Sequence, residues 1–162
     1  MYLTRMEIED FGLFQSAEFD SMGPGLTVVF GRNETGKTTL MHFLRGMFYG
    51  FSGPERSRYL ETWSAGGTNS PGGGTVHMAG GDGNHHELRR TVTWDPSGRW
   101  QDQVALKGDG APVSDPDGAL SQILGSVDEA TFARIYSVGL AELQELSLLG
   151  ETDAAQLIYR LT

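Results

Sequence analysis

Eight residues in the first quarter of the chain constrain its fold more than any other stretch. Gly31-Arg-Asn-Glu-Thr-Gly-Lys-Thr38 matches the pattern G-x-x-x-x-G-K-[ST]. The β-branched and aromatic run Leu26–Phe30 comes directly before it, and apolar residues recur at helical spacing from Lys37 to Tyr49, where Gly50 follows as a stop. A buried strand that leads into the motif and a helix that follows it are the context this motif requires. The stretch therefore predicts a phosphate-binding P-loop in an α/β fold.

Each position of the loop has a mechanical role. The glycines let the backbone close around an anion, and the amides at the start of the following helix point toward it. The ammonium of Lys37 is expected to stabilise the β- and γ-phosphates of a nucleotide as the catalytic group, and the Thr38 hydroxyl to bind Mg²⁺ as the metal ligand. The predicted nucleotide-binding residues are Gly31, Arg32, Asn33, Glu34, Thr35, Gly36, Lys37, Thr38 and Thr39. The alternative is a glycine turn that merely joins a strand to a helix.

The segments around this loop read mostly as β structure. Polarity alternates at the start of the chain, with Met6 and Ile8 on one face, which predicts a half-buried strand. The run Leu26–Phe30 is expected to be a strand buried on both faces. Further short strands are expected over 16–19, 75–78 and 87–94, and near Val104.

The last third changes to helical patterns. A helix is expected over Asp117–Leu124, and Ser126 and Glu129 have the spacing of a capping box before a helix that ends near Tyr136. Two more short helices are expected over 141–149 and 153–161. This change of character divides the chain into a β-rich lobe, residues 1–114, and a helical segment, residues 115–162.

Composition narrows the class of protein. The 162 residues include no cysteine, so neither a disulfide framework nor a thiolate metal site is expected. Met1–Trp100 has 9 basic and 11 acidic residues, whereas Gln101–Thr162 has 3 and 10, which places most of the net charge of −9 in the second part. That balance argues against a surface adapted to coat nucleic acid. The sequence has no apolar run long enough to span a membrane, and a cytoplasmic location is expected.

Several longer stretches carry a family resemblance. The chain resembles the ATP-binding head of the SMC-like ATPases of DNA double-strand-break repair, and among them the bacterial YhaN type. The stretches that carry the resemblance are LTRMEIEDFGLF, GPGLTVVFGRNETGKTTLMHFLRGMFYGF, RSRYLETW, HELRRTV and ILGSVDEATFARIYSVGLAELQEL.

The resemblance implies a P-loop NTPase fold, namely the N-terminal lobe of an ABC/SMC-type head. It implies a mixed sheet, an antiparallel β subdomain and a C-terminal helical segment that leads toward a coiled coil. The implied ligands are ATP and Mg²⁺. The implied partners are the protein's own C-terminal lobe, with its Asp-Glu strand and signature motif, a second head that sandwiches ATP, a nuclease subunit and DNA. The implied function is ATP hydrolysis that controls DNA end processing.

The chain also departs from the family pattern. Ser137, Val138 and Gly139 stand where a Mg²⁺-bridging glutamine is usual, and Gln144 comes later. The sequence contains no apolar strand ending in Asp-Glu, and Thr91–Asp95 reads as a hairpin end because Pro96 follows. Ser64–Thr68 only imitates the signature motif. Two other functions therefore stay open: an ABC transporter ATPase subunit, and a non-hydrolysing nucleotide-binding module that works by interaction.

Other polar and aromatic residues have ordinary structural explanations. Adjacent His85 and His86 should point to opposite faces of a strand and not chelate one ion, which favours a surface or strand-edge role. The arginines could contact phosphates, but solvated strand faces and ion pairs with nearby glutamates are favoured. The tryptophans could stack on a base, but a core role is favoured. These arginines are Arg56, Arg58, Arg89 and Arg90, the glutamates are Glu55, Glu61 and Glu87, and the tryptophans are Trp63, Trp94 and Trp100.

Overall fold

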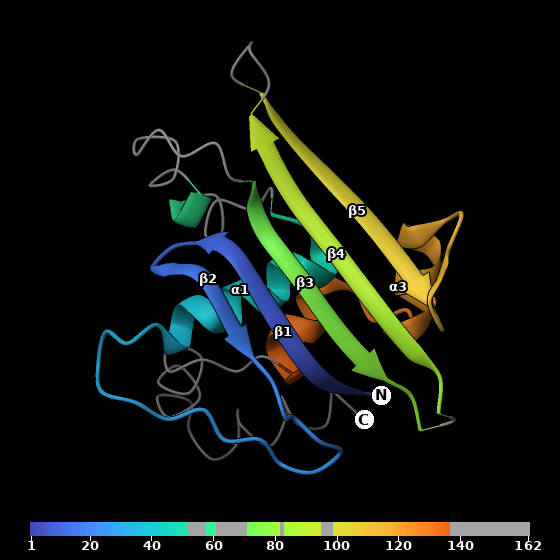
Figure 1. Cartoon of the computed structure of the whole chain (residues 1–162), viewed down its shortest axis with the longest axis horizontal. Helices are drawn as coiled ribbons and strands as arrows, with labels where there is room; N and C mark the ends of the chain where they lie inside the picture. The colour runs from blue at the N-terminus through green and yellow to red at the C-terminus, as the bar shows by residue number, and fades with distance from the viewer. Residues whose placement is uncertain (52–57, 61–70, 82, 95–98, 137–162) are drawn as a thin grey trace, which may run out of the picture. The chain divides into compact units, whose positions relative to one another are not determined.

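One antiparallel sheet organises the first compact unit of the chain, Met1–Ser126. The computed structural model describes residues 1–51, 58–60, 71–81, 83–94 and 99–136. Six strands pair in the order β2-β1-β3-β4-β5-β6, and α1 and α3 pack against strands of the sheet (Figure 1). The strands are β1 (Tyr2–Phe11), β2 (Phe14–Phe19), β3 (Gly72–Ala79), β4 (His85–Trp94), β5 (Trp100–Gly108) and β6 (Ala111–Pro112). Two helices of the first unit lie wholly within the described residues: α1 (Lys37–Tyr49) and α3 (Pro116–Ile123).

Period-2 alternation gives the sheet one apolar and one polar face. In β1, Met6 and Ile8 are buried, and they pair in register with Val76 and Gly74 of β3. Leu88 of β4 is fully buried and faces Leu106 of β5 across the ladder. The predicted strands over 16–19, 75–78 and 87–94 and near Val104 are therefore confirmed.

Helix α1 supplies the other half of the core. Its buried residues recur at helical spacing and lie against the apolar face of the sheet, as the sequence predicts. The Phe11 ring of β1 lies 5.7 Å from the ring of Phe43, 5.4 Å from Phe51 and 5.1 Å from Tyr59, centroid to centroid. The contact between Phe11 and Phe43 fixes α1 on the sheet, and α1 in turn positions the Gly31–Thr38 loop at its N-terminus. The buried residues of α1 are Thr39, Leu40, His42, Phe43, Gly46, Met47 and Phe48.

The predicted strand at Leu26–Phe30 is wrong. The segment has no strand hydrogen bonding, and its apolar side chains are exposed: 93% for Leu26, 66% for Val28 and 89% for Phe30. A strand in the middle of a sheet needs a hydrogen-bonded strand along each edge and packed layers over both faces, and the described residues place no strand beside this run. For the same reason the described sheet is antiparallel throughout, not the mixed sheet that the resemblance implied.

The helix predicted over Asp117–Leu124 is confirmed as α3, whose N-cap Asp115 accepts a hydrogen bond from the Gly118 amide at 3.1 Å. The predicted cap at Ser126 is wrong. In the second unit, which starts at Val127, Asp128 caps α4 (Glu129–Thr131) because its carboxylate accepts from the Thr131 amide at 2.7 Å. The π-helical turn η1 (Phe132–Tyr136) follows.

The helices expected over 141–149 and 153–161 lie outside the described residues, as do Ser64–Thr68, Ser137–Gly139 and Gln144. Among the helices of the described part, none has the length and apolar character needed to cross a membrane.

Candidate nucleotide-binding site

The loop between Gly31 and Thr38 is closed on itself by its own lysine. The Lys37 ammonium donates hydrogen bonds to the carbonyl oxygens of Gly31, at 2.8 Å, and Arg32, at 2.6 Å. The Thr35 hydroxyl donates to the same Arg32 carbonyl at 2.9 Å. A Cβ on Gly31 would lie 2.6 Å from the Thr35 hydroxyl oxygen, so only glycine allows this close approach. The loop is compact, and its one ammonium group lies against the backbone.

Gly36 joins the loop to α1 and fixes where the helix begins. It is the N-cap, with a φ of 97° in the left-handed region, and its carbonyl accepts the Leu40 amide at 2.8 Å. Since the residue has no side chain to cap the helix, the first amides of α1 lack both a side-chain acceptor and an intrahelical one. The first turn also contains no acidic residue. This end of α1 therefore combines free donors with the positive end of the helix dipole, which suits an anion.

The turn between β1 and β2 packs directly on this junction. A Cβ on Gly36 would lie 2.8 Å from the Phe14 ring and 3.1 Å from the methyl groups of Leu13. On the other side of the turn, a Cβ on Gly12 would lie 2.8 Å from the Thr39 methyl group. The first hairpin therefore holds the start of α1 from the sheet side. Sequence reasoning missed Leu13 and Phe14, although the Gly12 turn in the first hairpin was a signal for a close approach.

The predicted site residues thus form one continuous structure. Arg32, Asn33, Glu34 and Thr35 are exposed in the loop, Gly36 is buried at the junction, and Lys37 and Thr38 are exposed in the first turn of α1. Thr39 is only 7% exposed and faces the hairpin, so it serves packing. At the start of α1, the Lys37 and Thr38 side chains therefore remain accessible for phosphate or Mg²⁺.

The other arginine candidates lie elsewhere. Arg89 is on the polar face of the sheet, where it is ion-paired with Glu9, which is not among the glutamates expected from the sequence. Arg90 is 6% exposed on the apolar face, so the prediction of a solvated strand residue is wrong for it. The Arg58 guanidinium stacks 5.0 Å from the Tyr59 ring centroid. Arg56, Glu55, Glu61 and Trp63 lie outside the described residues, whereas Trp94 and Trp100 pair across the ladder of β4 and β5.

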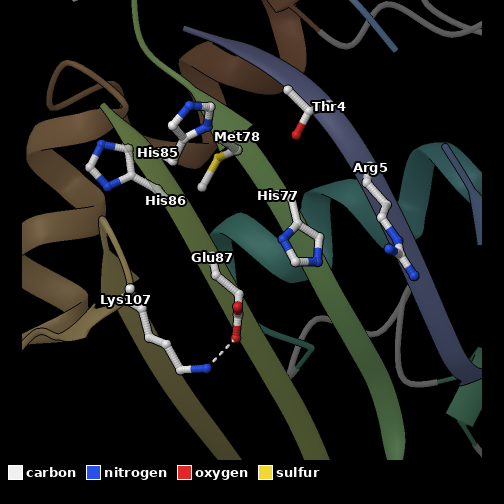
Figure 2. Close-up of a pocket in the computed structure, with 9 residues that line it drawn as sticks. Thr4, Arg5, His77, Met78, His85, His86, Glu87 and Lys107 are labelled. Carbon is white, nitrogen blue, oxygen red and sulfur yellow. Dashed lines mark hydrogen bonds and ion pairs between the residues drawn. The ribbon is translucent and has the colours of Figure 1, made fainter. Parts of the chain in front are cut away.

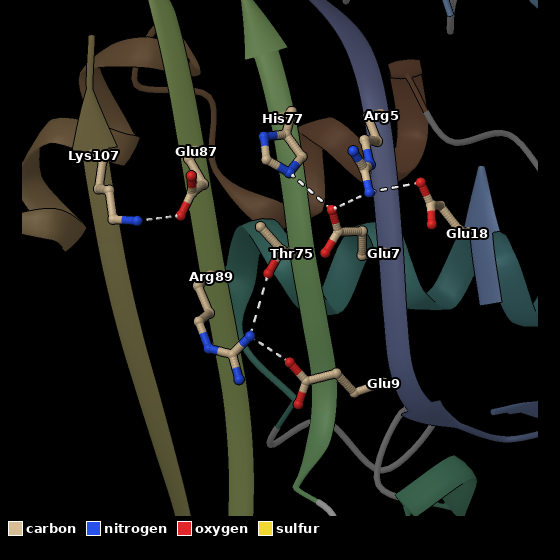
Figure 3. A network of polar contacts seen from close by, with 9 residues as sticks. All are labelled: Arg5, Glu7, Glu9, Glu18, Thr75, His77, Glu87, Arg89 and Lys107. Carbon is tan, nitrogen blue, oxygen red and sulfur yellow. Dashed lines mark hydrogen bonds and ion pairs between the residues drawn. The ribbon is translucent and has the colours of Figure 1, made fainter. Parts of the chain in front are cut away.

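The polar face of the sheet carries a network of ion pairs (Figure 3). Arg5 bridges Glu7 at 2.9 Å and Glu18 at 2.6 Å, and Lys107 binds Glu87 at 2.6 Å. The Lys107 hydrogen bond lowers the pKa of Glu87, against a smaller opposing effect of burial. Since these cations are paired with carboxylates of neighbouring strands, the face is close to neutral and offers no concentrated positive charge to a polyanion.

A hollow of about 290 Å³ opens on the same face (Figure 2). His85 and His86 both line it although they are neighbours in the chain, and His77 lies beside them. Lys107 and Arg5 also line the hollow, but their charges are engaged by the carboxylates named above. Within the described ranges, no group of three or more His, Asp or Glu residues is arranged to hold a metal ion.

Comparison with known proteins identifies a family whose match includes the loop. Residues 1–158 match the family described as AAA domain. The chain belongs to this family. AAA-domain proteins of this type are SMC-like P-loop ATPases, which bind nucleotide and usually Mg²⁺. The chain is also 26% identical over 141 residues to the uncharacterized protein YhaN of Bacillus subtilis (strain 168). That match covers 87% of this chain and 13% of YhaN, so the chain spans a small part of its relative's length.

Proposed function

We propose that this AAA-domain chain is the ATP-binding N-terminal part of an SMC-like ATPase whose ATP hydrolysis controls DNA end processing in double-strand-break repair. The observation that carries the ATP-binding step is the loop itself. Lys37 reaches back 2.6–2.8 Å to two loop carbonyls, directly before a helix whose first amides are free. A triphosphate at this helix end gains the dipole, the amides and the ammonium together.

The residues present fit Mg·ATP. Gly31 and Gly36 make close approaches to neighbouring side chains that a Cβ would block, so glycine at both positions fits the tight turn that a phosphate loop needs. The Lys37 ammonium would exchange the Arg32 carbonyl for a phosphate oxygen and stabilise the charge that develops when water attacks the γ-phosphorus. The Thr38 hydroxyl would hold Mg²⁺, which neutralises charge on the β- and γ-oxygens when bound.

The chain needs a second lobe for catalysis. The general base and the signature motif belong, in the proposed architecture, to the protein's own C-terminal lobe. The exposed apolar run Leu26–Phe30 supports this partner, because β-branched and aromatic residues gain from burial in a sheet and here lie in solvent. The short span relative to YhaN is consistent with a longer protein.

The remaining partners rest on resemblance. Two such heads would sandwich ATP between them, and closure of the heads would move coiled coils and control a nuclease subunit on DNA ends. Because the charges on the polar face of the sheet are paired, that face offers DNA no concentrated positive charge. We therefore do not propose that this lobe contacts DNA.

Removal of the Lys37 charge tests the site. Lys37→Ala should raise the Kd for Mg·ATP at least about tenfold, because charge-assisted hydrogen bonds contribute about 1.5–3 kcal/mol each. The melting temperature without nucleotide should stay nearly unchanged, since the side chain is exposed. Titration with a fluorescent ATP analogue measures the affinity. Lys107→Ala is the matched control, because Lys107 is the only other lysine of the sequence. Equal affinities of wild type and Lys37→Ala would refute the site.

Reconstitution separates the proposed role from its alternatives. The chain alone should bind nucleotide but hydrolyse it poorly, and addition of the C-terminal lobe of the same protein should restore turnover that DNA ends stimulate. A complex that never hydrolyses ATP would favour a nucleotide-dependent interaction module. Turnover that responds to a membrane transporter partner and not to DNA ends would favour the ABC transporter subunit.

A further inference from the structure

Arg90 is a buried charge at a position of β4 that normally takes an apolar side chain. The residue is 6% exposed and lies on the same face of the sheet as Leu88 and Val92, which are fully buried. Burial of a guanidinium costs several kcal/mol unless carboxylates and hydrogen bonds compensate. Its place in the core therefore requires a specific set of partners.

Two carboxylates at different distances from the guanidinium supply that compensation. A terminal nitrogen of Arg90 donates to Asp117 in the first turn of α3 at 3.2 Å. The Nε of Arg90 lies 3.8 Å from Asp102 of β5, too far for a hydrogen bond, and has no hydrogen-bond partner. A shift of less than about 1 Å would bring Nε and Asp102 within hydrogen-bond distance. Of these two carboxylates, Asp117 therefore accepts a hydrogen bond from the guanidinium, and Asp102 lies just beyond hydrogen-bond distance of Nε.

The same cluster lies against the C-terminal end of α1. A Cβ on the C-cap Gly50 would lie 3.0 Å from Arg90 Nη1 and 3.1 Å from Asp102 Oδ2, and the Phe51 amide donates to Asp102 at 3.3 Å. The last turn of α1 has no basic residue of its own. Arg90 therefore supplies the positive charge that favours a helix C-terminus, and any movement of that end changes its distance to Asp102.

The two ends of α1 thus have different tasks. The phosphate loop forms the N-terminal end, and 13 residues later, about 20 Å along the axis, the helix meets Arg90. We propose that Arg90 is a positioning residue that couples binding of Mg·nucleoside triphosphate at the loop to the placement of α3. When nucleotide binds and moves the start of α1, Arg90 shifts between Asp117 and Asp102. The bond between Arg90 and Asp117 therefore holds α3 in one nucleotide state of the loop and releases it in the other. The coupling rests on the proposed function of the loop.

Hydrogen exchange of α3 tests this coupling with Asp117→Asn. The Asp117 side chain is 73% exposed, so the substitution should leave the fold intact while it removes the charge that pairs with Arg90. In wild type, saturation with Mg²⁺ and a non-hydrolysable ATP analogue should change the exchange rate of the α3 amides about fivefold, the lower end of usual coupling strengths. In Asp117→Asn, the analogue should leave the exchange rate of the α3 amides nearly unchanged. Asp20→Asn, an exposed carboxylate outside the cluster, should keep the wild-type response.

A second variant tests the geometry. Arg90→Lys keeps the charge but loses the planar fork, so it should also lose the nucleotide response of α3. Retention of the full response in Asp117→Asn, or an unresponsive α3 in a wild type that binds the analogue, would overturn the coupling. Titration of the same samples shows separately whether nucleotide binds. Failure to bind there overturns the proposed function together with the coupling.

Discussion

Glu34 is the strained residue of the phosphate loop. Its φ of 68° lies in the left-handed region, which costs a non-glycine residue about 1 kcal/mol or more. Its carboxylate also brings a negative charge into a loop that is proposed to bind a triphosphate. Both features are expected to oppose binding or folding, so we expect the Glu34 side chain to weaken the site.

Substitution of Glu34 separates the effect of charge from that of backbone strain. Glu34→Gln removes only the charge and should lower the Kd for Mg·ATP about two- to fivefold at low salt, with a smaller gain at high salt because the loop is exposed. Glu34→Gly also removes the backbone strain, but glycine has more conformational freedom in the unfolded chain. Little change in the free energy of unfolding is therefore expected. Titrations at two ionic strengths measure the affinity. A weaker affinity in Glu34→Gln would mean that the carboxylate contributes to binding.

The pair of Glu87 and Lys107 makes stability depend on pH. Since the pKa of Glu87 is lowered in the folded protein, its contribution is complete above the pKa of the unfolded chain and is lost as pH falls through the folded value. Lys107→Met should therefore lower the free energy of unfolding by about 0.5 kcal/mol at pH 7, a size typical of an exposed pair. The difference from wild type should vanish once the pH has fallen below the lowered pKa of Glu87 in the folded protein. Urea titrations across pH measure it, and a difference that persists in acid would assign the loss to packing.

At the scale of the element, α1 lies close to the segment that follows it because one of its residues is glycine. The Phe51 ring occupies the place where a Cβ on Gly46 would stand. Gly46→Ala should therefore destabilise the fold by about 1–3 kcal/mol despite the higher helix propensity of alanine. Chemical denaturation measures the loss. Gly23→Ala is the control, since no atom lies within 4 Å of its added Cβ. Stabilisation by Gly46→Ala would show that Phe51 moves aside freely.

The elements that sequence patterns predicted are those whose partners lie within the described chain. Local periodicity predicted β1, the hairpin of β3 and β4, and α1. Each of these elements packs or pairs with another described element of the sheet. Leu26–Phe30 has an equally clear strand composition, but a strand also needs neighbours, and composition does not report them. Arg90 was misjudged for a related reason, because its carboxylate partners come from β5 and α3. The compact turn of the loop follows from its glycines, which act locally, whereas its binding of nucleotide stays a prediction.

At the scale of the whole molecule, Leu26–Phe30 leaves a contiguous apolar run in solvent next to the phosphate loop. Leu26 and Phe30 are about nine-tenths exposed at its two ends, and Val28 is 66% exposed between them. Burial of such side chains is worth about 1.5–3 kcal/mol each, so the run favours association with any surface that completes it. Within the part of the chain that the structure describes, no strand lies beside the run, and the run leads directly into the loop where nucleotide is proposed to bind.

Val28→Asp tests whether that run is a surface or part of a core. If it is a surface of the isolated chain, the charge should leave the free energy of unfolding within about 0.5 kcal/mol of wild type, as for other exposed sites. It should also reduce self-association at high concentration and block assembly with the C-terminal lobe. Denaturation, light scattering and co-purification measure the three effects. Ser21→Asp adds the same charge outside the run and should leave all three unchanged. A loss of several kcal/mol in the isolated chain would place Val28 in a core and restore the buried strand that its composition predicts.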